Sequence, residues 1–112
     1  MARYKFLVMT RPVEGQEQEY EEWYQNIHLN EVVAIDGFKS AQRFRLQQAV
    51  MPGPDLPGYL AIYDIETDDI NSAIQELMKR SASGQMVISK ALCTEGGFAA
   101  VYEESGPVVK AG

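Results

Sequence analysis

The sequence predicts an α+β fold in which four β-strands and two α-helices follow one another in the order βαββαβ. Apolar residues alternate with the period of two that is typical of strands in residues 3–9, 38–50, 59–66 and 98–105. Between these segments, two windows show the three-to-four residue spacing of amphipathic helices. A third observation is the proline-rich stretch 51–58, which separates the two middle strands.

The first strand is expected at residues 3–9, RYKFLVM, where both faces carry apolar side chains. The segment TRPVEG then interrupts the alternation with a proline and a glycine. From about residue 16 the period becomes helical. The apolar face of this first helix should be formed by Tyr20, Trp23 or Tyr24, and Ile27.

The helical periodicity becomes unclear after Ile27. The segment NEVVAIDG allows one more helical turn, which Gly37 would end with a left-handed cap. The loop 51–58, MPGPDLPG, holds three of the five prolines and cannot lie inside a helix or a central strand. Between Gly37 and this loop, one face of the second strand should be formed by Phe38, Ser40, Gln42, Phe44 and Leu46.

The second half of the chain repeats the alternation of strand and helix. The third strand is expected at residues 59–66, and Thr67 can cap the helix that follows. Residues 84–97 indicate only a loop with one short helical turn, and the fourth strand is expected at 98–105. The inner stripe of the second helix should be formed by Ile70, Ala73, Ile74, Leu77 and Ser81.

In this order the elements form the ferredoxin-like unit, a four-stranded antiparallel sheet with two helices on one face. A chain of 112 residues fits a single domain, residues 1–112. Two helices cannot cover both faces of the sheet. However, the first, third and fourth strands carry apolar residues on both faces, whereas an antiparallel sheet with one solvated face normally alternates more cleanly. We therefore expect a homodimer in which sheet faces sheet.

The composition is that of an ordinary soluble globular protein, with 46% hydrophobic and 23% charged residues and a net charge of −6. The basic residues are scattered, which argues against nucleic acid as a partner. Five of the sixteen acidic residues lie between positions 14 and 22 and should form a solvated helix face. No apolar run is long enough to span a membrane, and the N-terminus lacks a signal-peptide cleavage site. A cytoplasmic location is expected.

Metal and cofactor chemistry is not expected. With one histidine, His28, and one cysteine, Cys93, only carboxylates remain as ligands, and they show no recognisable ligand spacing. A single cysteine excludes an intrachain disulfide and is more typical of a small buried residue than of a nucleophile. No glycine-rich phosphate loop is present.

His28 and Tyr24 are the main candidates for catalysis. They are four residues apart and therefore share one face of a helix. An imidazole beside a phenol can exchange protons with a bound carbonyl or phenol. The alternative is a structural histidine at a helix break, bonded to a backbone carbonyl. We expect His28 to reach a small, mostly apolar pocket beside the first helix, and Trp23 to face the core or a dimer contact instead.

Arg43 is the second candidate, because a charge in the middle of a strand is unfavourable unless it is paired. It is suited to anchor a carboxylate or an enolate, or it pairs with Glu31 or Asp64. The aromatic residues should mainly be core, but some can line a ligand pocket between helix and sheet. The aromatic candidates for substrate binding are Tyr4, Phe6 and Tyr63.

The stretch WYQNIHLNEVVAIDGFKSAQRF, residues 23–44, resembles the dimeric α/β-barrel superfamily, in particular its EthD-like branch. That resemblance implies ferredoxin-like protomers that pair into a barrel. The superfamily includes cofactor-free monooxygenases, polyketide cyclases, lactone isomerases and haem-degrading enzymes, and also members with no established activity. Ile27 and Asn30 stand where the branch often has a second polar residue and a proline. The matching pairs are Trp23-Tyr24, His28-Leu29, Gly37-Phe38 and Arg43-Phe44.

The leading hypothesis is a cofactor-independent enzyme that acts on a small aromatic or polyketide-like molecule. His28 would be the general acid or base, Tyr24 its hydrogen-bonding partner and Arg43 an anion anchor. Isomerisation, cyclisation and oxygen insertion are not distinguished, and the substrate is not identified. The alternative is a non-catalytic small-molecule-binding or accessory protein of a degradation or biosynthesis pathway. A third option is a dimeric interaction module without a ligand.

Overall fold

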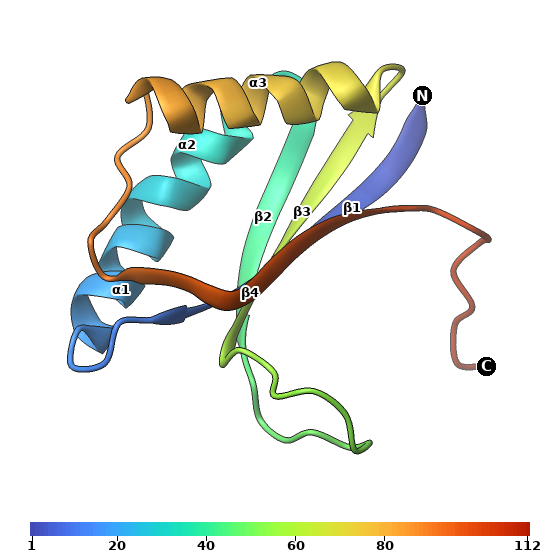
Figure 1. The fold of residues 1–112 in the computed structure, drawn as a ribbon. Helices are drawn as coiled ribbons and strands as arrows, with labels where there is room; N and C mark the ends of the chain where they lie inside the picture. Colours follow the sequence, from blue (N-terminus) through green and yellow to red (C-terminus); the bar gives the residue numbers. More distant parts are fainter.

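The computed structural model describes all 112 residues. Its four strands and its helical segments alternate in the expected order (Figure 1). The first helical region is continuous and contains a short π-helix, η1, between α1 and α2. The elements are β1 (Ala2–Pro12), α1 (Glu17–Trp23), η1 (Tyr24–His28), α2 (Leu29–Val33), β2 (Phe38–Arg45), β3 (Tyr59–Thr67), α3 (Ile70–Ser83) and β4 (Leu92–Glu103).

The four strands form one antiparallel sheet in the order β2-β3-β1-β4. The helices pack on one side of it, and the loop between β2 and β3 projects beyond the end of the sheet (Figure 1). The predicted ferredoxin-like α+β arrangement is therefore confirmed. It brings the two central strands, β1 and β3, under the helices, where the core lies.

The unclear periodicity after Ile27 has a structural cause in η1. The amide of Leu29 donates to the carbonyl of Tyr24, five residues earlier, instead of the four of an α-helix. This extra residue rotates everything that follows. Leu29 and Val32 are buried in the core, whereas Ile27, which the α-helical spacing places on the buried face, is 41% exposed. The expectation for Ile27 was therefore wrong, because it assumed a regular helix.

Strand β2 begins with an irregularity that the sequence pattern does not reveal. The register with β3 shifts between Phe38 and Ser40. Phe38 is buried in the core, while Ser40 bonds Asp64 on the other face of the sheet. The prediction that Phe38 shares a face with the rest of the alternating residues was therefore wrong. The bulge reverses the alternation at Lys39.

Asp69, and not Thr67, caps α3. The Asp69 carboxylate accepts from the amide of Ser72 at 3.1 Å, while the Thr67 hydroxyl accepts from the amide of Asp69. The helix ends at Gly84, which has a positive φ of 85°. The predicted inner stripe is confirmed, since Ala73 and Leu77 are buried and its other members are partly buried.

Strand β4 begins at Leu92, six residues before the expected start. The sequence signal fails there because Gly96 and Gly97 interrupt the alternation, and the register with β1 shifts between Met9 and Arg11. A Cβ atom at Gly97 would lie only 2.7 Å from the carbonyl oxygen of Met9. Glycine is therefore required where β4 passes closest to β1.

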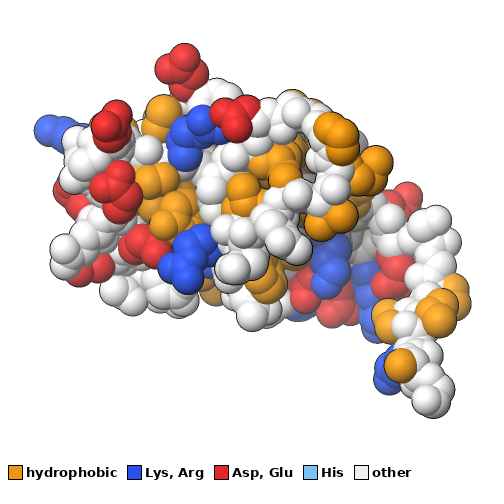
Figure 2. Space-filling model, turned by 90° about the horizontal axis from the view of Figure 1, so that it is seen from below, with side chains coloured by type: hydrophobic (Ala, Val, Ile, Leu, Met, Phe, Trp, Pro, Cys, Tyr) orange, Lys and Arg blue, Asp and Glu red, His pale blue; other side chains and the backbone are white.

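The two faces of the sheet differ sharply in burial. The face under the helices carries fully buried side chains such as Tyr63 and Ile65. The open face is apolar in its middle, and Phe44 and Phe98 on it are 42% and 48% exposed. Figure 2 shows hydrophobic side chains gathered in patches on the surface seen from below, and again on the projecting C-terminal tail. The half-buried apolar residues of the open face are Leu7, Met9, Leu60, Ile62 and Ala100.

We expect Gly97→Ala to destabilise the protein, because its new methyl group would press on the Met9 carbonyl. The expected loss is about 1–3 kcal/mol of unfolding free energy, the usual range for a backbone clash. Urea denaturation measures it. Gly106→Ala is the matched control, since a Cβ there meets nothing within 4 Å. Equal stability of the two variants would contradict the close approach of β4 to β1.

Candidate functional site

An aromatic cluster fills the space between the α1–η1 segment and β3. The ring of Tyr20 is the hub, with centroid distances of 5.5 Å to Tyr24 and 5.1 Å to Tyr59. Trp23 lies 5.2 Å from Tyr24 on the helical side. Sequence reasoning placed Tyr20 in the core but assigned no role to it or to Tyr59. The helical spacing of Tyr20 and Tyr24 was the available signal for their proximity.

The phenols of Tyr20 and Tyr24 are protonated at neutral pH. The Tyr20 hydroxyl shares a buried 2.7 Å hydrogen bond with Thr10 on β1, and burial raises the pKa of Tyr20. Burial also raises the pKa of Tyr24 to about 12. Both groups are therefore hydrogen-bond donors under physiological conditions, and neither is a base.

Arg43 extends from β2 over the faces of three of these rings. Its guanidinium carbon lies 4.9 Å from the ring centroid of Tyr24, 5.5 Å from that of Tyr59 and 5.7 Å from that of Tyr20. The side chain is only 11% exposed and pairs with the carboxylate of Glu21 on α1. The proposed partners Glu31 and Asp64 were wrong, because Asp64 pairs with Lys5 and Glu31 bonds the backbone of Val87.

Glu21 belongs to the acidic run that was expected to be a solvated helix face. Its carboxylate forms an ion pair with Arg43, the residue that lies over three rings of the aromatic cluster. A cleft of about 160 Å³ lies outside this ion pair, lined by Glu21, Gln25, Arg43, Phe44, Arg45 and Tyr59.

His28 stacks on Trp23, with ring centroids 4.8 Å apart and an interplanar angle of 26°. Its ring meets Tyr24 edge-on at 5.2 Å, and the two side chains form no hydrogen bond. Trp23 is buried in the core, as expected, but it does not face away from His28, which the α-helical spacing had suggested. The π-helical turn brings these residues, five apart, together on one face. The expected hydrogen bond between His28 and Tyr24 was also wrong.

The imidazole of His28 is held neutral. Its Nδ1 atom is buried and has no hydrogen-bond partner. Burial lowers the pKa of His28 from 6.5 to about 4. At neutral pH one ring nitrogen carries a hydrogen and the other can accept a proton, but the ring lacks the second proton that an imidazolium would donate as an acid. Of the two expected roles, the resting state therefore favours the base.

Tyr63 and Phe6 lie under the cluster, on β3 and β1. Tyr63 is fully buried, and its hydroxyl lies near that of Tyr24 without a well-aligned hydrogen bond. Burial raises the pKa of Tyr63 strongly. The Phe6 ring packs 5.7 Å from that of Tyr63 and offers only an apolar surface. Two of the three buried side-chain polar atoms without a partner, His28 Nδ1 and Tyr63 Oη, thus lie next to Tyr24.

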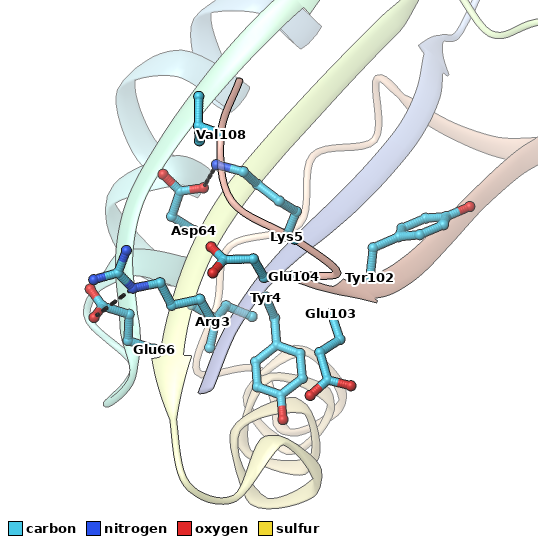
Figure 3. Close-up of a pocket in the computed structure, with 11 residues that line it drawn as sticks. Arg3, Tyr4, Lys5, Asp64, Glu66, Tyr102, Glu103, Glu104 and Val108 are labelled. Carbon is cyan, nitrogen blue, oxygen red and sulfur yellow. Dashed lines mark hydrogen bonds and ion pairs between the residues drawn. The ribbon is translucent and has the colours of Figure 1, made fainter. Parts of the chain in front are cut away.

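Tyr4 is separate from these residues. It lies on β1, closer to the N-terminus than Phe6, and borders a cavity of about 550 Å³ near the chain termini. Figure 3 shows this cavity, with the ion pairs Arg3–Glu66 and Lys5–Asp64 drawn and with Tyr4 and Tyr102 pointing in different directions. Tyr4 also packs against the edge of the core cluster, and its place in one binding site with His28 stays a prediction.

His28 lines none of the five cavities of about 100 to 630 Å³, so the pocket expected beside it stays a prediction. The nearest is an open groove of about 630 Å³ on the outer side of Trp23, bordered also by Ile27 and Val87. No group of three or more His, Cys, Asp or Glu residues is placed to hold a metal ion. None of the helices has the length and apolar character needed to cross a bilayer.

No family model matches the chain, and no curated protein matches it. A "putative monooxygenase" from Shewanella loihica PV-4 is similar in structure, with a TM-score of 0.60, 16% sequence identity and coverage of 99% of each chain. An ethyl tert-butyl ether d (EthD) family protein from Bacillus halodurans C-125 gives a TM-score of 0.47 at 17% identity, covering 94% of this chain and 100% of that one. The first similarity establishes the fold, which is the one that the EthD-like resemblance implies.

We expect the stability of the protein to fall between pH 6.5 and pH 4, because the unfolded chain binds a proton at His28 that the folded chain does not. The contribution of His28 is fully present above pH 6.5 and is lost as the pH falls toward 4, by up to about 3 kcal/mol. Urea denaturation at several pH values measures this loss. His28→Phe keeps a ring against Trp23, and its unfolding free energy should depend less on pH in this range. An identical pH dependence in both proteins would contradict the buried, neutral imidazole.

Proposed function

We propose that the protein binds a small aromatic or polyketide-like molecule between the helix and the sheet and removes a proton from it without a cofactor. His28 is the base. We place the protein in the EthD-like branch of the dimeric α/β barrels on the resemblance of residues 23–44 and on the shared fold. The fold by itself does not select a reaction, so the proposal depends on the site.

The observation that carries the proposal is the unpartnered Nδ1 atom of His28. A buried polar atom without a partner is unfavourable and needs an explanation. Here it lies among aromatic rings, on a π-helical turn, a feature that often marks functional sites. An aromatic ligand would find flat apolar surfaces in this cluster, and its acidic proton would complete the missing hydrogen bond.

The proposed step is a simple proton transfer. His28 takes the proton of an acidic C–H or O–H bond and becomes imidazolium, while the electron pair of that bond stays on the ligand as an enolate or phenolate. The low pKa of His28 describes the ligand-free site, in which no anion lies beside the ring. An anion formed in contact would favour the imidazolium and raise that pKa.

Protonated phenols and a guanidinium surround the position of this anion. The hydroxyls of Tyr24 and Tyr63 are donors at neutral pH and are suited to bond a ligand oxygen. Arg43 is proposed to stabilise the anion, with the ligand competing against Glu21 for the guanidinium.

Three reactions share this first step. Isomerisation returns the proton at a second position, and cyclisation uses the carbanion to attack a carbonyl of the same molecule. Oxygen insertion consumes molecular oxygen, one atom entering the ligand and the other leaving as water. The proposal therefore stops at proton removal.

A non-catalytic binding or accessory role is the second candidate. Two observations favour it: the low pKa of His28 makes the ring a weak base, and the guanidinium of Arg43 is already paired with Glu21. In that role the same aromatic rings hold a ligand without changing it.

We also propose that two copies pair through their open sheet faces, in the cytoplasm, since one cysteine requires no oxidising compartment. Contiguous apolar surface of this kind is uncommon on monomers and is typical of interaction sites. The open face combines the exposed rings of Phe44 and Phe98 with half-buried aliphatic side chains between them. A two-fold axis through the sheet would bury both copies of this face at once.

The catalytic proposal is tested by offering the purified protein a panel of naphthols and anthrones, with and without oxygen, and following the products by absorbance. His28→Phe should lower turnover about 10²- to 10⁴-fold, the usual contribution of a general base, while it keeps the ring stack. The neighbouring control Ile27→Ala, at an exposed position, should retain activity. Trp23 fluorescence measures binding independently.

The outcomes separate the two candidates. Binding to wild-type protein with no turnover would favour the accessory role and overturn the enzyme. Unchanged turnover in His28→Phe would remove His28 from the mechanism.

The dimer is tested by light scattering at micromolar concentration. Wild-type protein should have about twice the mass of the 12.5 kDa chain. Phe98→Asp, on the open face, should shift it to the monomer, because a charge would be buried in the interface. Val109→Asp, on the exposed tail, makes the same kind of change outside that face and should remain dimeric. A wild-type mass of one chain would contradict the pairing.

A further inference from the structure

The segment that joins α3 to β4, residues 84–91, is tied to the first helix through a single residue. The indole Nε1 of Trp23 donates to the carbonyl of Val87 at 2.6 Å. The carboxylate of Glu31 accepts from the amide of the same residue, with both oxygens at 3.2 Å. Both backbone groups of Val87 are thus bound by helix side chains that lie 56 to 64 positions away in the sequence.

These two attachments lie on either side of His28 along the helix. Trp23 precedes it by one π-helical turn and stacks on its ring, and Glu31 follows it by about one turn. The segment is also anchored by Met86 and Ala91, which are buried in the core. By contrast, the side chains of Val87 and Ile88 are 57% and 45% exposed. The backbone at Val87, and not its side chain, therefore faces the helix.

No charged side chain forms an ion pair with His28, and its ring lies against those of Trp23 and Tyr24. The carboxylate nearest to it along the helix, that of Glu31, is directed at Val87. Glu31 can therefore influence the position of His28 only indirectly. It holds Val87, Val87 accepts from the Trp23 indole, and that indole stacks on His28. The groove of about 630 Å³ lies on the outer side of this arrangement, with Trp23 and Val87 in its wall.

We propose that Glu31 is a positioning residue for His28: by holding Val87, it keeps residues 84–91 closed as a cover and fixes the Trp23 indole against the imidazole. Release of Val87 opens a path from the groove to His28. The inference rests on the proposed function only for its effect on turnover. The closure itself concerns the accessibility of the ring, which is measurable without a substrate.

The protein offers two single-residue probes, because His28 is its only histidine and Trp23 its only tryptophan. Diethylpyrocarbonate modifies the imidazole, and the rate at 240 nm reports the accessibility of His28 alone. Titration of His28, by NMR or by the quenching of Trp23 fluorescence, reports its surroundings. Neither measurement depends on activity.

Glu31→Ala should raise the modification rate of His28 about tenfold or more, since a hydrogen bond to a charged acceptor that holds the cover is lost. The pKa of His28 should rise from about 4 toward 6.5 as water reaches the ring. Glu31→Gln keeps one acceptor oxygen for the Val87 amide and should stay close to wild type. Glu22→Ala is the matched control: it removes the same charge from the same helical region, at a residue that lines the groove and accepts a hydrogen bond from Gln18 but none from Val87.

A Glu31→Ala protein that folds but behaves like Glu22→Ala in both measurements would overturn the proposal. If Glu31→Ala does not fold, hydrogen exchange in wild-type protein decides: opening of the Val87 amide and modification of His28 should share one rate and one temperature dependence, and unrelated values would overturn it. Altered access in Glu31→Ala, without any turnover by the wild type, would sink the catalytic proposal and leave this one standing.

Discussion

The site depends on one backbone hydrogen bond, from the amide of Leu29 to the carbonyl of Tyr24. It adds a residue to one helical turn and so joins two helical faces that would otherwise not align. Before it, Tyr20 and Tyr24 face the sheet; after it, Leu29 and Val32 do. The same extra residue turns Ile27 outward and brings His28 against Trp23. Core packing on both sides holds the π-helical turn in place, since a regular helix would bury one half of this face and expose the other.

Burial of polar groups then gives the site its electrostatic character. Imidazole and phenol lose water in the aromatic cluster, and each moves toward its neutral form: the pKa of His28 falls to about 4 and that of Tyr24 rises to about 12. The one cation in the cluster, Arg43, pairs with Glu21 and lies over the faces of three rings. A neutral imidazole, protonated phenols and a compensated cation surround the place where we propose that a weakly acidic aromatic ligand binds.

The two faces of the sheet differ in what covers them. The covered face holds the core and the candidate site, and the open face remains apolar and accessible. Bulges at the start of β2 and near the start of β4 adjust which side chains reach each face. The loop 84–91 runs from α3 to β4 and is bound to the first helical region at Val87, so it links both helical regions to the sheet.

The sequence by itself determined the order of the elements, the ferredoxin-like arrangement and the apolar character of both sheet faces, because periods of two and of three to four residues are local properties. It also identified His28, Tyr24, Arg43 and Tyr63 as residues of interest. The tertiary structure decided what they contact. The π-helical turn, the bulges, the Glu21–Arg43 pair and the Val87 attachment all depend on packing between segments far apart in the chain. Burial, which sets the pKa of each group, follows from that packing and has no signature in the local pattern.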